Sequence, residues 1–127
     1  MNELCNYEDV LNNVKDSLDN LIKNALEKNI SERNIIVDPG IGFSKDINQN
    51  LEILRNLDVF KNLNFPILIG ASRKRFIGEI LNEKNPKERD IGTLAVSCLC
   101  SQLNIDIVRV HNVKPVSYTH LTLPTKA

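Results

Sequence analysis

Tryptophan is absent from the sequence, and cysteine and histidine are scarce, with three and two residues respectively. Three cysteines do not make a disulfide framework. Cys98 and Cys100 are two residues apart, so on a helix they point in different directions and cannot share a metal ion on one face. Two histidines are too few for a histidine-based metal cluster. We therefore expect no metal ligands in this chain, and cysteines that are small buried side chains in a reducing compartment.

The sequence also lacks a net charge and a long hydrophobic run. Sixteen Lys and Arg balance sixteen Asp and Glu, and phosphate-backbone binding usually needs a basic surplus, so no nucleic-acid partner is expected. The longest apolar runs, such as Pro66–Ile69, are far shorter than the roughly 20 residues of a membrane helix. Met1–Cys5 shows no basic region followed by an apolar stretch, as a secretory signal would. We expect a cytoplasmic protein without a membrane partner.

The residues that are present predict one modest globular domain: 127 residues, of which 42% are hydrophobic and 25% charged. The apolar pattern predicts three strands, at 35–37 (ending at Asp38), 66–70 and 105–110. A helix over 7–28 comes before the first strand, and a helix that Asp46 or Asn48 caps follows it. Two helices separate the second strand from the third: one that Ser72 caps, and one with apolar positions Ile91, Leu94, Ala95, Cys98 and Leu99.

The predicted strands are short, continuously apolar and separated by helices. They start roughly 30 to 40 residues apart, which is the length of a βα unit. Continuous apolar strands are typical of a parallel sheet that is covered on both faces. The sequence therefore predicts an α/β fold, and two architectures remain open: a doubly wound open sheet and a piece of a (β/α)₈ barrel.

Each predicted strand is followed at once by polar residues: Asp38, then Ser72–Lys74, then Arg109 and His111. In both architectures ligands bind at that end of a parallel sheet. Cations at a helix N-terminus oppose the macrodipole unless an anion lies between them and the backbone N–H groups. Arg109 and His111, two apart on one face of a strand, would make a phosphate clamp. If the strands are neighbours, these groups converge on one pocket.

Two of these features also have simpler interpretations. The carboxylate of Asp38 suits the paired N–H donors of an amino-pyrimidinone edge, but Asp-Pro-Gly is also common turn chemistry. Phe43, in a loop rich in glycine, is either a lid over the pocket or a core residue. The residues by themselves leave these alternatives open.

Four segments closely resemble dihydropteroate synthase: Ile36–Lys45, Ile69–Gly78, Gly92–Ala95 and Arg109–His111. The resemblance extends from about Tyr7 to Lys114. It implies the C-terminal part of a pterin-binding (β/α)₈ TIM barrel, with strands six to eight only. The family condenses dihydropterin pyrophosphate with p-aminobenzoate to dihydropteroate in folate biosynthesis and releases pyrophosphate.

The resemblance also implies roles for the polar residues. Asp38 would hold the amino-pyrimidinone edge of the pterin, and Lys74 would hydrogen-bond the pterin ring beside the p-aminobenzoate site. Arg109 and His111 would bind the leaving pyrophosphate. Lys74, Arg109 and His111 would thus be the catalytic residues, acting by orientation and electrostatic stabilisation.

Four further residues would contact substrates according to the same resemblance. Phe43 would pack near the aminobenzoate ring, and Arg75 would attract the aminobenzoate carboxylate at a helix N-terminus. Ser72 and Arg73, which precede the lysine, would belong to the same anion-binding turn. Two other readings are a related pterin-binding methyltransferase barrel, which has no pyrophosphate to bind, and a non-catalytic phosphate- or pterin-binding fragment.

The resemblance implies a Mg²⁺ cofactor, whose ligand would lie in an N-terminal half that this sequence does not include, and a homodimer for the full-length enzyme. An incomplete barrel would be inactive alone. Residues 1–115 would form the C-terminal part of the barrel domain. Residues 116–127 are expected to be a non-native tail, because Ser117–Ala127 has no helical apolar stripe and contains three threonines and a proline.

Overall fold

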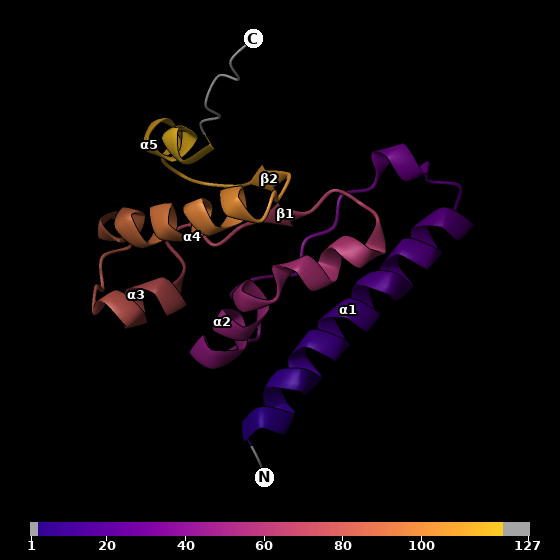
Figure 1. Ribbon diagram of the computed structural model, residues 1–127, viewed down its shortest axis with the longest axis horizontal. Coiled ribbons are helices and arrows are strands. Elements are labelled where there is room, and N and C mark those ends of the chain that lie inside the picture. The colour runs from indigo at the N-terminus through magenta and orange to yellow at the C-terminus, as the bar shows by residue number, and fades with distance from the viewer. Residues whose placement is uncertain (1–2, 121–127) are drawn as a thin grey trace.

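The computed structural model describes residues 3–120 (Figure 1). Its elements, in chain order, are α1 (Glu3–Glu27), the 3-10 helix η1 (Glu32–Asn34), α2 (Ile47–Arg55), η2 (Leu57–Leu63), β1 (Leu68–Ile69), α3 (Arg75–Leu81), η3 (Pro86–Arg89), α4 (Asp90–Gln102), β2 (Ile107–Val108), α5 (Val113–Ser117) and η4 (Tyr118–His120). This order confirms the α/β class and every predicted helix. None of these helices, within residues 3–120, is long and apolar enough to cross a membrane.

Three segments run side by side in the parallel arrangement that the sequence predicts. Leu68 of β1 lies opposite Ile107 of β2, and a single bridge joins Val37 to Ile67 on the other edge of β1. All three predicted strands are shorter than expected, and the first is only this bridge. The segment at Val37 pairs on one side alone, through its N–H to Pro66 O at 2.9 Å and its C=O to Leu68 N at 2.8 Å. A segment with one neighbour has no ladder partner for half of its backbone groups.

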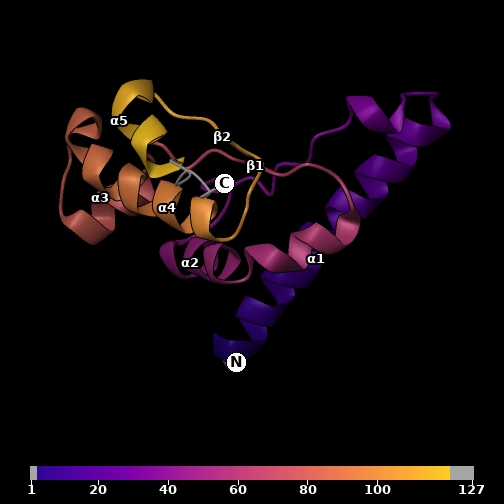
Figure 2. The ribbon, with the colours of Figure 1, turned by 45° about the horizontal axis from the view of Figure 1, so that its top comes forward.

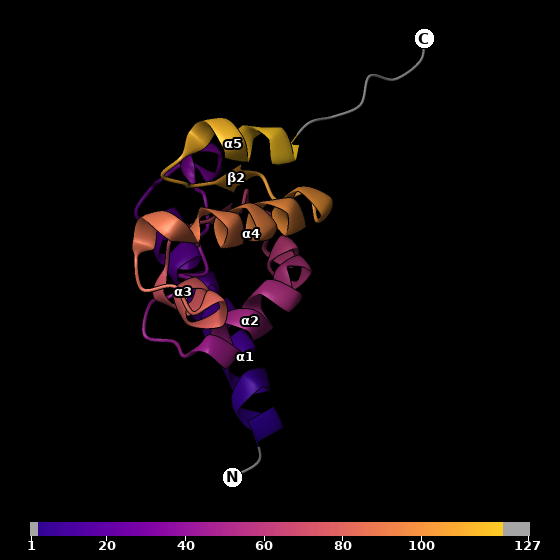
Figure 3. The same cartoon turned by 90° about the vertical axis from the view of Figure 1, so that its left-hand side faces the viewer.

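The helices cover the strands unevenly. In Figure 3 helices α2, α3 and α4 lie below β2 and α5 lies above it. The long helix α1 packs against α2 (Figure 2). The core lies between these helices and the strands, and its most deeply buried apolar side chains are those of Phe60, Ile41, Ile53, Leu57, Ile67, Ile69 and Cys100. Burying a side chain of this size stabilises a fold by about 1.5–3 kcal/mol.

The start of α2 is fixed by a reciprocal cap. Asp46 Oδ1 accepts a hydrogen bond from Gln49 N at 2.8 Å, and Gln49 Oε1 accepts one from Asp46 N at 3.0 Å. This capping box satisfies two N–H groups that would otherwise have no partner within the helix. It confirms Asp46, rather than Asn48, as the cap. The helix in turn carries the buried Ile53 and Leu54 into the core.

We predict that Asp46→Ala lowers the free energy of unfolding by about 1 kcal/mol, the usual cost of losing an N-cap side chain. Urea unfolding followed by circular dichroism measures the change. Asp16→Ala, which removes an exposed carboxylate from the middle of α1, is the matched control and should change stability by less than about 0.5 kcal/mol. Equal effects of the two substitutions would contradict the role of the capping box.

Helix α4 turns a different face to the core from the one predicted. Its buried residues are Thr93, Ser97 and Cys100, whereas Ile91 is 75% exposed. The helix is apolar on most sides, so its pattern could not select a face. Thr93 and Ser97 are small and line the same small cavity as Ile69 of β1 and Val108 of β2. Cys100 is buried as predicted, and burial raises the pKa of its thiol to about 11; Cys98 is exposed, which corrects the expectation for that residue.

The end of the described chain is more ordered than the composition suggests. Ser117 ends α5, and residues 118–120 form a 3-10 turn that contacts α4. Val116 is 4% exposed, so the chain packs just past the expected boundary at 115. This burial explains the helix despite poor local propensity. The remaining part of the expected tail, residues 121–127, lies outside the described residues, and its origin stays a prediction.

Candidate functional site

The ends of the three parallel segments bring Asp38 close to Arg109, as the sequence predicts. Arg109 Nη1 lies 3.6 Å from Asp38 Oδ2, and both side chains are partly exposed. Asp38 Oδ1 also accepts a hydrogen bond from Gly40 N at 2.8 Å, so the carboxylate both closes the turn and faces the site. The guanidinium of Arg109 lies across Gly70 and leaves no room there for a Cβ atom. A glycine at that position lets the cation reach the carboxylate.

Lys74 reaches the same region from the start of α3. Its Nζ donates a hydrogen bond to Ile41 O and lies 4.4 Å from the centroid of the Phe43 ring, which is the geometry of a cation–π contact. Phe43 is 63% exposed, so it is not a core residue. The core interpretation of Phe43 is therefore wrong, and its role as a lid stays a prediction.

The ammonium of Lys74 is easier to deprotonate than an exposed lysine. Burial is the main cause of its lowered pKa; Asp38 opposes the shift, whereas Arg109 and Lys45 add to it. Burial likewise lowers the pKa of Lys45, and Asp38 opposes the shift there too. Three cations around one carboxylate make this region electropositive, and a bound anion would relieve the repulsion among them.

Two residues that the sequence analysis did not single out shape the loop that carries Phe43. Lys45 Nζ donates to Gly40 O at 2.7 Å and to Phe43 O at 2.9 Å. Asn50 Oδ1 accepts from Gly42 N at 2.7 Å, and Asn50 is 1% exposed. A signal for Asn50 was present: it lies one helical turn before Ile53 and Leu54, on the buried stripe of α2.

Ser72 and His111 join the ends of the two strands. Ser72 Oγ lies 2.8 Å from His111 Nδ1 and accepts a hydrogen bond from His111 N at 3.1 Å. Ser72 is 8% exposed and does not cap α3, which begins after Lys74. The predicted cap is therefore wrong, because the hydroxyl is already engaged across the strands. Its position orients the imidazole instead.

Arg73 and Arg75 each pair with an acidic side chain other than Asp38. Arg73 Nε lies 2.9 Å from Asp90 Oδ1 and its Nη2 lies 3.3 Å from Asp90 Oδ2. This hydrogen-bonded pair lowers the pKa of Asp90 and raises that of Arg73. The side chain of Arg75 is 90% exposed and contacts Glu79 at 2.8 Å. The structure therefore gathers Asp38, Lys74 and Arg109, and turns Arg73 toward α4.

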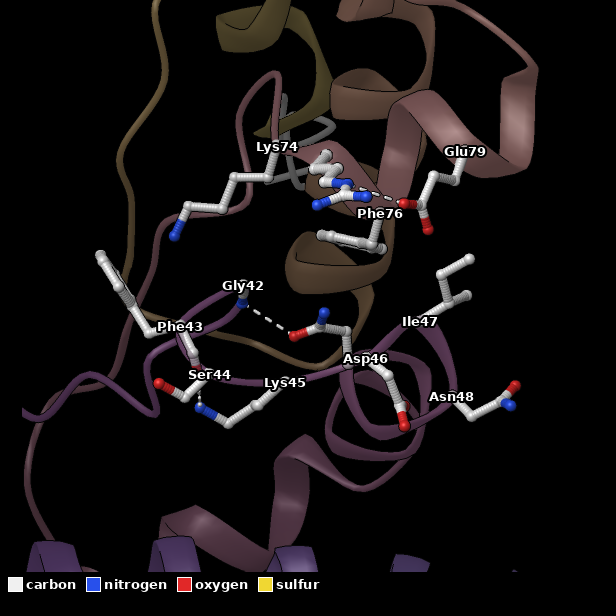
Figure 4. Close-up of a pocket in the computed structure, with 12 residues that line it drawn as sticks. Gly42, Phe43, Ser44, Lys45, Asp46, Ile47, Asn48, Lys74, Phe76 and Glu79 are labelled. Atoms are coloured by element: carbon white, nitrogen blue, oxygen red, sulfur yellow. Dashed lines mark hydrogen bonds and ion pairs between the residues drawn. The ribbon is translucent and has the colours of Figure 1, made fainter.

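A cleft of about 630 Å³ opens beside this cluster (Figure 4). Lys74 and Phe76 lie on one side of it and Phe43 on the other. It is lined by Gly42, Phe43, Ser44, Lys45, Asp46, Ile47, Asn48, Asn50, Lys74, Arg75, Phe76 and Glu79. Asp38, Arg109 and His111 do not line the cleft. The site therefore has two parts, an aromatic cleft and a charged cluster, and Lys74 and Phe43 stand between them.

A magnesium ion does not fit the residues described. Within residues 3–120 no group of three or more His, Cys, Asp and Glu side chains could hold a metal ion. Asp38, the carboxylate at the strand ends, is engaged by Gly40 N and Arg109. We therefore derive no step through a metal ion.

The family of pterin binding enzymes matches residues 1–111. The chain belongs to this pterin-binding family. The dihydropteroate synthase of Bacillus subtilis is 46% identical over 112 residues, which are 88% of this chain and 39% of that protein. The dihydropteroate synthase of Synechocystis is 41% identical over 117 residues, which are 92% of this chain and 40% of that protein. The chain thus spans about two fifths of the length of these relatives.

Solved structures of the pterin-binding family agree with the fold. A dihydropteroate synthase from Coxiella burnetii in complex with pteroic acid superposes with a TM-score of 0.86 at 33% identity, covering 90% of this chain and 42% of that one. The synthase from Xanthomonas albilineans in complex with 7,8-dihydropteroate gives 0.85 at 34% identity, covering 88% and 43%. The two-strand sheet and its helices are therefore part of the family's barrel, which decides between the two architectures that the sequence left open.

A side chain at position 42 would collide with Lys74. The φ of Gly42 is +88°, and a Cβ there would lie 2.7 Å from Lys74 Cδ, whereas a Cβ on Gly40, at φ +75°, would come no closer than 3.5 Å to Lys45 Nζ. We predict that Gly40→Ala costs about 1–2 kcal/mol from the left-handed backbone alone. Gly42→Ala should cost more, because Lys74 must also leave Ile41 O. Urea unfolding of both variants measures this difference, and equal losses would contradict it.

Proposed function

We propose that this chain supplies part of the active site of a dihydropteroate synthase. The reaction condenses dihydropterin pyrophosphate with p-aminobenzoate to dihydropteroate in folate biosynthesis. The observation that carries the proposal is the convergence of Asp38, Lys74 and Arg109 at the ends of parallel segments, in a chain that is 46% identical to a dihydropteroate synthase. Solved relatives bind 7,8-dihydropteroate, the product of this reaction, and pteroic acid, its oxidised form.

The pterin would lie over the charged cluster. Asp38 accepts the paired N–H donors of the amino-pyrimidinone edge, and Lys74 donates to the ring. The ion pair between Asp38 and Arg109 is long, at 3.6 Å, and both groups are partly exposed, so a ligand can separate it at little cost. The carboxylate keeps its hydrogen bond from Gly40 N, which holds it toward the ligand.

The pyrophosphate would bind Arg109 and His111. Ser72, which holds the imidazole through Nδ1, leaves Nε2 for the anion. Of the turn at 72–74, only Lys74 would then touch substrate directly, because Ser72 is buried and Arg73 is paired with Asp90.

The p-aminobenzoate would occupy the cleft. The Phe43 ring would stack on the aromatic ring, and Arg75 at the first turn of α3 would attract the carboxylate. Lys74, which touches both parts of the site, would then lie between the two substrates. This arrangement holds the arylamine beside the pterin methylene.

The reaction is a substitution at that methylene carbon. The C–O bond to pyrophosphate breaks, and its electron pair leaves with the anion, which Arg109 and His111 stabilise. The arylamine nitrogen forms the new C–N bond and then releases one proton to solvent or to the departing pyrophosphate. An arylamine is uncharged near neutral pH, so the site needs no general base.

The remaining features of the whole enzyme are proposals of the same kind. The segment at Val37, β1 and β2 would be strands six, seven and eight of the barrel, within a domain portion at 1–115 that residues 116–127 follow as a non-native tail. A magnesium ion would be held by residues outside this chain. The complete enzyme would be a cytoplasmic homodimer.

A chimera tests the function. The 112 matched residues of the Bacillus subtilis synthase are replaced by those of this chain, and dihydropteroate formation is measured. We expect turnover; a folded chimera that binds substrates without turnover would contradict the proposal. Calorimetry on the same chimera compares pterin pyrophosphate with plain pyrophosphate, and equal affinities would indicate a generic anion site instead.

A further inference from the structure

Arg73 has a backbone conformation that its side chain does not favour. Its φ is +58°, in the left-handed region. Among residues 3–120, the other non-glycine residues with positive φ are Asn29, Ser44, Asn64, Asn82 and Asn104. Asparagine and, less often, serine tolerate this region because their short polar side chains bond locally, whereas a long side chain gains nothing from it. Something outside the turn must therefore hold Arg73 there.

One short segment, residues 89–93, supplies those contacts. Arg73 N donates to Thr93 Oγ1 at 3.1 Å, and Arg73 O accepts from Arg89 Nη1 at 3.0 Å. The guanidinium pairs with Asp90 through two nitrogens, and both side chains are about three quarters buried. The backbone N–H, the backbone C=O and the side chain of a single residue are thus held by three residues at the junction of η3 and α4.

The holding side chains are themselves fixed. Arg89 also donates to Glu83 O at 2.9 Å and to Lys84 O at 3.0 Å, and it crosses Gly78 where a Cβ would clash. Thr93 is 4% exposed. The anchoring segment is therefore held in place, because the donor Arg89 has further backbone partners and the acceptor Thr93 is enclosed by the core.

These contacts affect the position of Lys74, the next residue in the chain. The carbonyl that Arg89 holds belongs to the peptide that joins Arg73 to Lys74, so its orientation sets the direction in which Lys74 leaves the turn. We propose that Arg89, Asp90 and Thr93 are positioning residues: they hold Arg73 in the left-handed conformation and thereby aim Lys74 at Ile41 O and the Phe43 ring. The inference rests on the proposed function only in making Lys74 a ligand contact.

Asp90 extends the same connection to the second strand end. It also accepts a hydrogen bond from Asn112 Nδ2 at 3.3 Å, next to His111. One carboxylate therefore touches both turns that bear the anion-binding groups. The positive charge of Arg73 therefore pairs with the Asp90 carboxylate.

The test observes Lys74 directly in the ligand-free 127-residue chain. A lysine ε-CH₂ close to an aromatic ring face has a proton NMR signal displaced upfield. Lys74→Arg assigns that signal, and Phe43→Leu shows how much of the displacement the ring causes. Both are reference variants that do not alter residues 89–93.

Two matched pairs then separate positioning from folding. Thr93→Val removes the acceptor for Arg73 N, whereas Thr93→Ser keeps it. Arg73→Ala loses the Asp90 contact and still bears a Cβ, whereas Arg73→Gly loses the same contact and adopts positive φ freely. We expect the ratio of molecules with Lys74 against the Phe43 ring to molecules with Lys74 away from it to fall about tenfold in Thr93→Val and Arg73→Ala. Thr93→Ser and Arg73→Gly should keep the upfield-shifted signal.

An unchanged Lys74 signal in Thr93→Val and Arg73→Ala would overturn the inference, and so would its loss in Arg73→Gly while circular dichroism stays unchanged. Binding of pyrophosphate to the chimera is measured separately. If the signal responds as expected and pyrophosphate does not bind, positioning stands and the proposed function fails. If pyrophosphate binds and the signal is the same in all variants, the reverse holds.

Discussion

The 127-residue chain by itself is expected to form no measurable dihydropteroate. A (β/α)₈ barrel needs roughly 250 residues, and the parallel sheet described here consists of β1, β2 and one bridge at Val37. Ile36, beside that bridge, is 54% exposed, and Ile107 in β2 is 36% exposed. Both edges thus present strand backbone and apolar side chains that the rest of a barrel would cover. Substrates bound to this chain alone would lack the contacts that the other strands of a complete barrel supply.

The experiment is complementation. This chain is expressed with and without the part of the Bacillus subtilis synthase that the match leaves out, and dihydropteroate is assayed in each case. Turnover should require both partners. A second preparation with residues 1–115 in place of the full chain tests whether the tail contributes. Turnover by the chain alone would show that this sheet and its helices form a complete site.

Removing Lys74 or Asp38 from the chimera is expected to reduce kcat/KM by at least about tenfold in each case. Each substitution by alanine removes a charge-assisted contact worth about 1.5–3 kcal/mol. Lys74 should affect kcat as well as KM, because it lies between the two parts of the site and touches the Phe43 ring. Asp38 should act mainly on pterin binding, since it faces the charged cluster and not the cleft.

Steady-state kinetics with each substrate varied in turn measures these effects. Lys84→Ala is the control, because Lys84 is exposed and does not line the cleft beside Phe43. Near-normal kcat/KM in both Lys74→Ala and Asp38→Ala would remove these residues from the site. Equal losses in the Lys84 control would point to a general effect of lost positive charge.

The sequence predicted those elements whose structure depends on residues close together in the chain. The apolar repeat predicted 7–28 for a helix that spans 3–27, and the sequence offered Asp46 or Asn48 as the cap of α2. The structure selects Asp46, whose partner Gln49 is only three residues away. The polar residues after each apolar run also indicated the charged cluster, because parallel strands end on one edge.

The sequence did not predict contacts between residues far apart in the chain. The triplet Ser72–Lys74 predicted one anion-binding turn, yet Ser72 bonds to His111 and Arg73 to Asp90. Their partners are 39 and 17 residues away. Similarly, α4 is apolar on most of its surface, so only packing against the strands could select Thr93 and Ser97 as its buried face.

The serine beneath His111 also fixes that residue before any ligand arrives. Ser72 Oγ lies 2.8 Å from His111 Nδ1 and accepts the backbone N–H of the same residue at 3.1 Å. One hydroxyl group therefore contacts both the ring and the backbone of His111. A side chain that is already held loses less conformational freedom when it binds a ligand. The entropic cost of ordering His111 thus falls on folding rather than on binding.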